Sequence, residues 1–250
     1  MAIGMNFEQS HANSLDTLNT LNRYQDFIDN IATVADMGCG IGLDAIWWAK
    51  LTKQDGTPRG IKINAVDNKL LYESMVRHKN INYIQADFTN SGLEPNSQDL
   101  LMSHNSLQFS INPMQTLLHW WEIMKPDAML LLTLPYNFTV DNHREIQKVN
   151  ATYANGCYFN WTLGNMIMML AATGFDCRNS HFRFDRVGNW IQAAVYKLPD
   201  QPDPTMNWYE MCDRKLLPIC MEQAIMKDGT FSDIDLVVEW IDRTQYMLSL

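Results

Sequence analysis

A short apolar segment that ends in an acidic residue and three glycines constrains this chain more than any other feature. Residues 34–43 read VADMGCGIGL, with Gly38, Gly40 and Gly42 at alternate positions. The following residues, 43–51, place apolar side chains at the spacing of one helical face. Glycine lets a ligand approach the backbone, and the N–H groups at a helix start attract polar or anionic groups. The pattern therefore predicts a strand, a tight turn and a helix that hold a small molecule.

The spacing of the glycines distinguishes between two classes of ligand. A dinucleotide-binding turn has the pattern G-x-G-x-x-G, whose third glycine would fall at Leu43, whereas the third glycine here is Gly42. The pattern Asp36-x-Gly38-x-Gly40-x-Gly42 instead resembles the first motif of the class I S-adenosylmethionine-dependent methyltransferases. The resemblance implies S-adenosyl-L-methionine as cofactor, with Gly38 and Gly40 beside its methionyl part and Asp36 ordering that end. Taken alone, the motif is also compatible with a glycine turn that binds no ligand.

The second predicted strand also ends in an acidic residue. Residues 61–67 read IKINAVD. In a nucleoside-binding βαβ unit, a carboxylate at this position accepts hydrogen bonds from the hydroxyls of a ribose. We therefore predict that Asp67, with the adjacent Asn68, contacts a ribose, although aspartate after a strand is also ordinary turn chemistry.

The third predicted strand, residues 81–84, leads into another acid, Asp87, which Phe88 follows. The methyltransferase resemblance implies that Asp87 accepts a hydrogen bond from the adenine amino group and that Phe88 lies along the base. The alternative is a loop aspartate followed by a core phenylalanine.

A fourth predicted strand, residues 99–103, is followed by His104 and Asn105. The alternation of strands and helices indicates a parallel sheet whose strands end at one edge, where ligands bind. The resemblance implies that the backbone of His104 and Asn105 approaches the cofactor. His104 is also the first candidate for a general base, because histidine titrates near neutrality, and Tyr136 is the second. His104 could instead face only the cofactor or the core.

The C-terminal half contains an antiparallel strand pair. Residues 177–184 and 190–198 both favour strands, and the segment between them is too short for a parallel crossover. This hairpin agrees with the fold that the resemblance implies: a Rossmann-like α/β fold with a seven-stranded, mostly parallel sheet, an antiparallel last strand and helices on both faces. A nicotinamide-dependent oxidoreductase fits this hairpin and the glycine spacing less well.

The chain is predicted to contain three regions. An N-terminal helical cap, residues 1–31, contains Tyr24, which could cover the cofactor. The S-adenosylmethionine-binding methyltransferase domain covers residues 32–198, and a proline-rich linker leads into a C-terminal helical extension, residues 199–250. The apolar stripe of the last helix could pack on the chain's own core or join two copies in a homo-oligomer.

Charge and composition indicate which classes of binding partner are disfavoured. The chain has 19 basic and 28 acidic residues and a net charge of −9, which argues against broad contact with nucleic-acid phosphates. Its 5 cysteines are scattered without zinc-ligand spacing, so we expect reduced thiols and no metal site. We recognise no signal peptide and no membrane-spanning run, and we expect a cytoplasmic protein without membrane contact.

These features together predict methyl transfer from S-adenosylmethionine to a small-molecule acceptor by in-line displacement. The sequence around residues 98–135 is most similar to the branch of the family that modifies small molecules. The Asn/Asp-Pro-Pro-Tyr signature of amino-methylating DNA enzymes is absent, and residues 103–106 read SHNS in its place. The alternative from a different class is a methyltransferase-like module that serves assembly and does not turn over the cofactor. No sequence feature separates an O-, N- or C-methyl acceptor.

Overall fold

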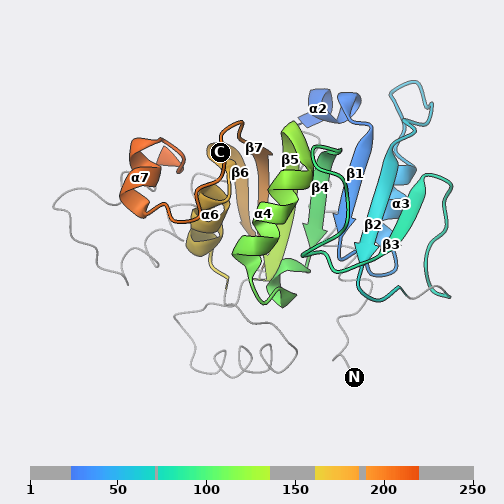
Figure 1. The fold of residues 1–250 in the computed structure, drawn as a ribbon. Helices are drawn as coiled ribbons and strands as arrows, with labels where there is room; N and C mark the ends of the chain where they lie inside the picture. Colours follow the sequence, from blue (N-terminus) through green and yellow to red (C-terminus); the bar gives the residue numbers. More distant parts are fainter. Residues whose placement is uncertain (1–23, 71–72, 136–160, 186–189, 220–250) are drawn as a thin grey trace.

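The structure is a computed structural model of the chain, and it describes residues 24–70, 73–135, 161–185 and 190–219 (Figure 1). Its centre is a seven-stranded sheet with the order β3-β2-β1-β4-β5-β7-β6. The strands are β1 (Thr33–Met37), β2 (Lys62–Asp67), β3 (Ile81–Gln85), β4 (Gln98–His104), β5 (Met124–Pro135), β6 (Phe175–Asp185) and β7 (Trp190–Lys197). β7 runs antiparallel to its neighbours β5 and β6, and the other pairs are parallel. The predicted fold class is confirmed.

Helices cover both faces of this sheet. They are α2 (Gln25–Asn30), α3 (Leu43–Ala49), α4 (Pro113–Ile123), α6 (Leu163–Ala172) and α7 (Trp208–Asp213), with a 3-10 turn at Leu107–Phe109. Side chains of α4 and α6 belong to one buried apolar cluster, and those of α2 and α3 to another. The two pairs of helices therefore lie on opposite faces, with α4 and α6 in front of the sheet in Figure 1.

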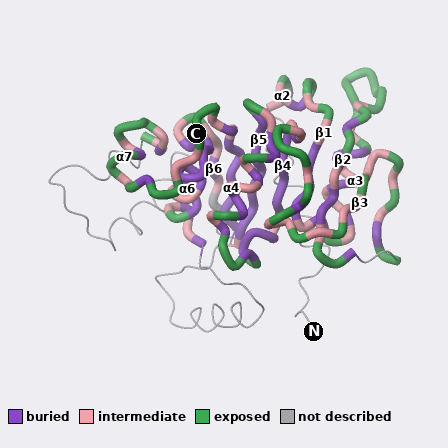
Figure 2. Tube along the Cα trace, in the orientation of Figure 1, coloured by how far each residue is buried: buried purple, intermediate pink, exposed green. Residues whose placement is uncertain are grey.

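The central strand β5 shows how the sequence produces this double cover. Leu130, Leu132 and Leu134 pack in the cluster with α4 and α6, whereas Met129 and Leu131 pack in the cluster with α2 and α3. Each of these side chains is at most 2% exposed. Successive residues of a strand point to opposite faces, so an uninterrupted apolar strand must be covered on both sides. The buried interior of the sheet is visible in Figure 2.

Local hydrogen bonds define the ends of the two covering helices. At the start of α4, the side chain of Asn112 accepts from the N–H of Gln115. At the start of α6, Thr162 and Asn165 form a reciprocal capping box. Gly174 follows α6 with a φ of +88°, as expected for the glycine that ends a helix in the left-handed conformation.

The connection from β2 to β3 differs from the sequence prediction. The alternation of elements predicted a helix between successive strands, but the described residues 68–70 and 73–80 contain none. Within these residues only Leu70 and Met75 are buried. Two isolated buried side chains do not make the continuous apolar stripe that a packed helix needs. β6 also begins at Phe175, earlier than predicted.

The N-terminal cap is described only from Tyr24 onward. The ring of Tyr24 meets that of Tyr196 edge-on, with centroids 6.2 Å apart, and Tyr196 pairs with Met129 in the first half of β5. Tyr24 therefore lies toward the amino ends of the parallel strands, and it does not cover the edge where their carboxyl ends meet. The rest of the predicted cap, Tyr136 and the extension from residue 220 lie outside the described residues. Within the described part, no helix has the length and apolarity needed to cross a bilayer.

Candidate functional site

The three glycines after β1 have different surroundings. A Cβ on Gly38 would overlap Ser106, and one on Gly42 would overlap the ring of Tyr83. A Cβ on Gly40, by contrast, would meet nothing within 4 Å. Gly38 and Gly42 are thus required by protein packing, whereas Gly40 borders open space that a ligand could enter.

Asp67 joins the end of β2 to this turn. Its Oδ2 accepts a hydrogen bond of 2.9 Å from the N–H of Gly40, and its Oδ1 accepts one of 3.0 Å from Lys69. The side chain is half-buried, and Asn68 beside it is exposed. Asp67 therefore lies at the open side of the turn, where sequence analysis placed the ribose contact.

Asp36, the acid that precedes the glycines, is almost fully buried. It is 2% exposed, and its Oδ2 has no hydrogen-bond partner among the described residues. Burial raises the pKa of this carboxyl well above its ordinary value, and the nearby carboxylates of Asp44 and Asp67 raise the pKa further. A hydrogen bond from the backbone of Ala45 opposes these effects.

The residues of this turn fit a ligand that carries a cationic group. A buried oxygen without a partner costs free energy that a ligand donor would recover. The carboxylates of Asp44 and Asp67 each interact electrostatically with that of Asp36, which favours a positive group close to Asp36. Gly40 provides the adjacent open space. S-adenosylmethionine, with its ammonium and sulfonium groups, has the chemistry that this set of residues would hold.

The pKa of Asp36 gives a prediction about stability. An acid whose pKa is raised on folding destabilises the folded state at pH values above its unfolded pKa, which is about 3.9. This destabilisation is lost as the pH falls toward that value. We compare the change in melting temperature that Asp36→Asn causes at about pH 8 with the change that it causes at about pH 4. We expect the change to be more positive at about pH 8. In a chain of this size, each kcal/mol corresponds to about 2–4 °C, measurable by thermal denaturation.

Asp203→Asn is the control, because the Thr205 hydroxyl and N–H bond to this exposed aspartate and lower its pKa. Its stabilising contribution is present above the unfolded pKa and is lost as the pH falls. The control should therefore lower stability at about pH 8 relative to about pH 4, which is the opposite sign. If the change in melting temperature caused by each variant were the same at both pH values, the assignment of the raised pKa to Asp36 would be contradicted.

The adenine candidates lie beyond the end of β3. Asp87 is exposed and its Oδ1 accepts a 2.8 Å hydrogen bond from Thr89. Phe88 is half-buried, its ring centroid lies 6.2 Å from that of Trp120, and its carbonyl accepts a 2.9 Å hydrogen bond from the Trp120 indole. Helix α4 therefore fixes the position of Phe88, while the Asp87 carboxylate stays accessible.

His104 and Asn105 lie at the carboxyl end of β4. His104 is 9% exposed, and its Nδ1 lies 3.5 Å from Oδ2 of Asp44 in the first turn of α3. Its ring meets that of Trp190 edge-on, with centroids 6.4 Å apart. Asn105 has a φ of +55°, and neither polar atom of its side chain has a hydrogen-bond partner among the described residues. Sequence analysis did not single out Asp44.

The sheet register brings the predicted residues to one edge. Asp36 pairs with Ala65 in β2 and with Met102 in β4, and Asp67 pairs with Gln85 in β3. The glycine turn, Asp67, Asp87 and His104 thus all lie at or just after the carboxyl ends of neighbouring parallel strands. Ligands of open α/β sheets bind at this edge.

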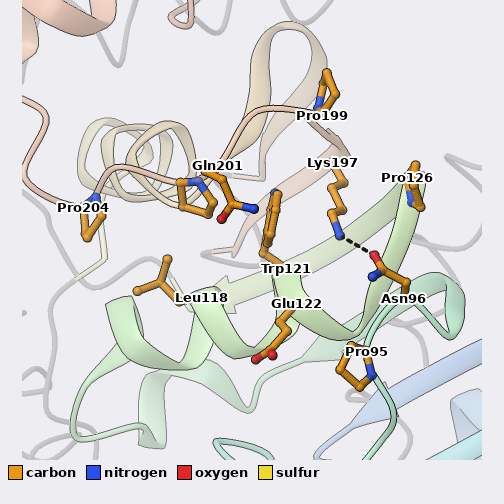
Figure 3. Close-up of a pocket in the computed structure, with 11 residues that line it drawn as sticks. Pro95, Asn96, Leu118, Trp121, Glu122, Pro126, Lys197, Pro199, Gln201 and Pro204 are labelled. Atoms are coloured by element: carbon orange, nitrogen blue, oxygen red, sulfur yellow. Dashed lines mark hydrogen bonds between the residues drawn. The ribbon is translucent and has the colours of Figure 1, made fainter.

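A pocket of about 710 Å³ lies at the opposite end of the strands. Figure 3 shows the side chains that line it. At its edge, the Lys197 ammonium donates to the carbonyl of Met124 at 2.6 Å and to Asn96 Oδ1 at 3.2 Å. The same ammonium lies 4.0 Å from the centroid of the Trp121 ring. Because Met124 begins β5 and Lys197 ends the antiparallel β7, this pocket is remote from the glycine turn. No predicted site residue lines it.

Comparison with known proteins agrees with the fold. Residues 35–132 match the family model of a methyltransferase domain. No curated protein sequence matches the chain. A solved S-adenosylmethionine-dependent methyltransferase from Archaeoglobus fulgidus aligns with a TM-score of 0.54 and 15% identity, over 73% of this chain and 93% of that chain.

A longer protein shows the same fold. Phosphoethanolamine N-methyltransferase 2 of Haemonchus contortus was solved with phosphomonomethylethanolamine and S-adenosylhomocysteine. It aligns with a TM-score of 0.52 and 16% identity over 67% of this chain and 49% of that chain. The present chain therefore spans about half the length of the Haemonchus enzyme.

The family match runs from β1 into β5 and contains the glycine turn and the ends of the first four strands. The sheet order and the antiparallel β7 agree with the fold of such a domain. Residues 35–132 are thus similar to a methyltransferase domain, and the described sheet has the fold of solved S-adenosylmethionine-dependent methyltransferases.

Proposed function

We propose that the protein transfers a methyl group from S-adenosylmethionine to a small-molecule acceptor by in-line displacement. The observation that carries this proposal is the convergence of Asp36, Gly40 and Asp67 at one edge, with open space beside Gly40. The net charge of −9 supports an acceptor other than nucleic acid. The Haemonchus contortus enzyme, which shares the fold, was solved with a small phosphorylated amine.

Each residue at this edge of the sheet would contact a different part of the cofactor. Asp67 with Asn68 would hold the ribose, and Asp87 with Phe88 would hold the adenine. Asp36 would order the methionyl part, with Gly38 and Gly40 alongside, and the backbone of His104 and Asn105 would approach the cofactor. The half-buried Asp67, the exposed Asp87 and the open side of Gly40 support this division.

The cofactor supplies a methyl group that its sulfonium already activates. The protein's residues hold the two reactants in line at near-attack distance, an arrangement that can contribute several kcal/mol. A base is required only if the acceptor arrives protonated. His104 is the first candidate for that base, because it follows β4 at the same edge; Tyr136 is the second and lies outside the described residues.

Calorimetric titration with S-adenosylmethionine tests the proposal. We expect the wild-type protein to bind and Asp67→Ala to weaken binding by about 100-fold or more, because each hydrogen bond to a charged acceptor contributes about 1.5–3 kcal/mol. Asp55→Ala is a matched control, since Asp55 likewise accepts from the N–H two residues ahead of it, in Thr57, but lies in the loop after α3. This control should bind like the wild type.

The titration also separates the competing functions. Absence of heat from a sample whose folding is shown by circular dichroism would overturn the methyltransferase proposal. A shift in NADH fluorescence would then indicate a nicotinamide-dependent enzyme, and a stable oligomer without any cofactor binding would indicate an assembly module.

A further inference from the structure

Three polar side chains form one row across the carboxyl-side half of the sheet. In the sheet register His104 pairs with Thr133, and Thr133 pairs with Gln192, so the three side chains lie on the same face. They are 9%, 1% and 6% exposed, respectively. The row lies toward the edge of the sheet where the ligands of open α/β sheets bind.

Two neighbours hold the imidazole of His104. Asp44 Oδ2 lies 3.5 Å from Nδ1 of His104, and the side chains of Asp44 and His104 are 12% and 5% exposed. Trp190, at the start of β7, meets the imidazole at an interplanar angle of 85°. Nδ1 is thus the ring nitrogen that faces Asp44 in α3, and the Trp190 indole packs edge-on against the ring.

We infer that Asp44 is a positioning residue for His104, and that His104 acts as the general base toward the methyl acceptor. This inference rests on the proposed function. A carboxylate beside Nδ1 favours the tautomer with the proton on Nδ1 and the lone pair on Nε2. It also stabilises the imidazolium that forms when Nε2 takes up a proton. The acceptor is therefore a molecule whose nucleophile, a hydroxyl or a protonated amine, must lose a proton.

The charge changes in this step place the new positive charge beside Asp44. The X–H bond of the acceptor breaks and its proton forms a bond to Nε2 of His104. The electron pair left on X forms the bond to the methyl carbon, and the pair of the carbon–sulfur bond stays on sulfur. The positive charge thus moves from the sulfonium to the imidazolium, 3.5 Å from the carboxylate. The preorganised carboxylate stabilises the charge where it develops.

Nitrogen-15 NMR of histidine-labelled protein tests the inference without an acceptor. The His104 signals are assigned by their loss in His104→Gln, and spectra are recorded near pH 9, where an ordinary histidine is neutral. We expect His104 in the Nδ1–H tautomer in the wild type and a mixture of tautomers in Asp44→Asn. Asp29→Asn is the control, because Asp29 also pairs with a basic side chain, Arg59, but at the amino end of the sheet. It should leave the His104 signals unchanged.

Two ligands distinguish a His104 that acts as a base from a His104 that only packs against Asp44. Sinefungin carries an amine where the cofactor carries its methyl group, and S-adenosylhomocysteine has no group there. We expect sinefungin, but not S-adenosylhomocysteine, to shift the Nε2 signal of His104, and Asp44→Asn to reduce that shift. Equal spectra with the two ligands, or an Nε2–H tautomer in the wild type, would overturn the inference. Absence of calorimetric binding by both ligands would instead overturn the proposed function and, with it, the role of His104 as base.

Discussion

Gly40→Val is expected to abolish S-adenosylmethionine binding while the protein remains folded. A Cβ at Gly40 would meet no atom within 4 Å, so the valine side chain would occupy the open space beside the turn. Its N–H is also the donor to Oδ2 of Asp67. Because the φ of Gly40 is +55°, a branched side chain strains the backbone by about 1–2 kcal/mol, a small part of the stability of a domain. Calorimetric titration and thermal denaturation measure the two effects separately.

Gly56→Val separates backbone strain from ligand exclusion. Gly56 has a φ of +81° and no atom within 4 Å of an added Cβ, but it lies in the loop after α3, away from the edge. This variant should lose similar stability and retain wild-type affinity. If Gly40→Val bound as tightly as Gly56→Val, the open space at Gly40 would not be the cofactor site.

The elements of the fold were predictable because their signals are local. The apolar run of β5 and the short connection between β6 and β7 each determine a structure within a few residues. The acids at the ends of β1 and β2, Asp36 and Asp67, could be placed on one edge because the carboxyl ends of parallel strands coincide. The sheet order places β4 beside β1 and β5 on the far side of β4, an arrangement that depends on contacts between segments distant in the sequence.

The parts of the site that could not be predicted depend on contacts between distant segments. An acidic residue in the first turn of a helix is ordinary helix-start chemistry, so Asp44 gives no signal until β4 brings His104 within 3.5 Å. The sequence likewise shows three equivalent glycines. Only the structure shows that Ser106 from the loop after β4 and Tyr83 from β3 occupy the space at Gly38 and Gly42.

Gly38→Ala is expected to lower the free energy of unfolding by about 2–5 kcal/mol, the combined cost of a positive φ and of overpacking. The φ of Gly38 is +81°, and its Cβ would overlap both side-chain atoms of Ser106, whose Oγ lies 3.4 Å from the Gly38 carbonyl. Chemical denaturation measures the loss. Gly92→Ala, at a φ of +70° with open space around it, should lose only the backbone part, about 1–2 kcal/mol.

Ser106→Gly combined with Gly38→Ala tests the overlap directly. Removing the serine side chain leaves only the strain of the positive φ and the added freedom of a glycine in the unfolded chain. The double variant should therefore be more stable than the sum of the two single variants predicts, by about 1–3 kcal/mol. If the stability changes of the two single variants were strictly additive, Ser106 would not overlap the side chain added at position 38. The first glycine of the motif would then have to be explained by the ligand, as Gly40 is.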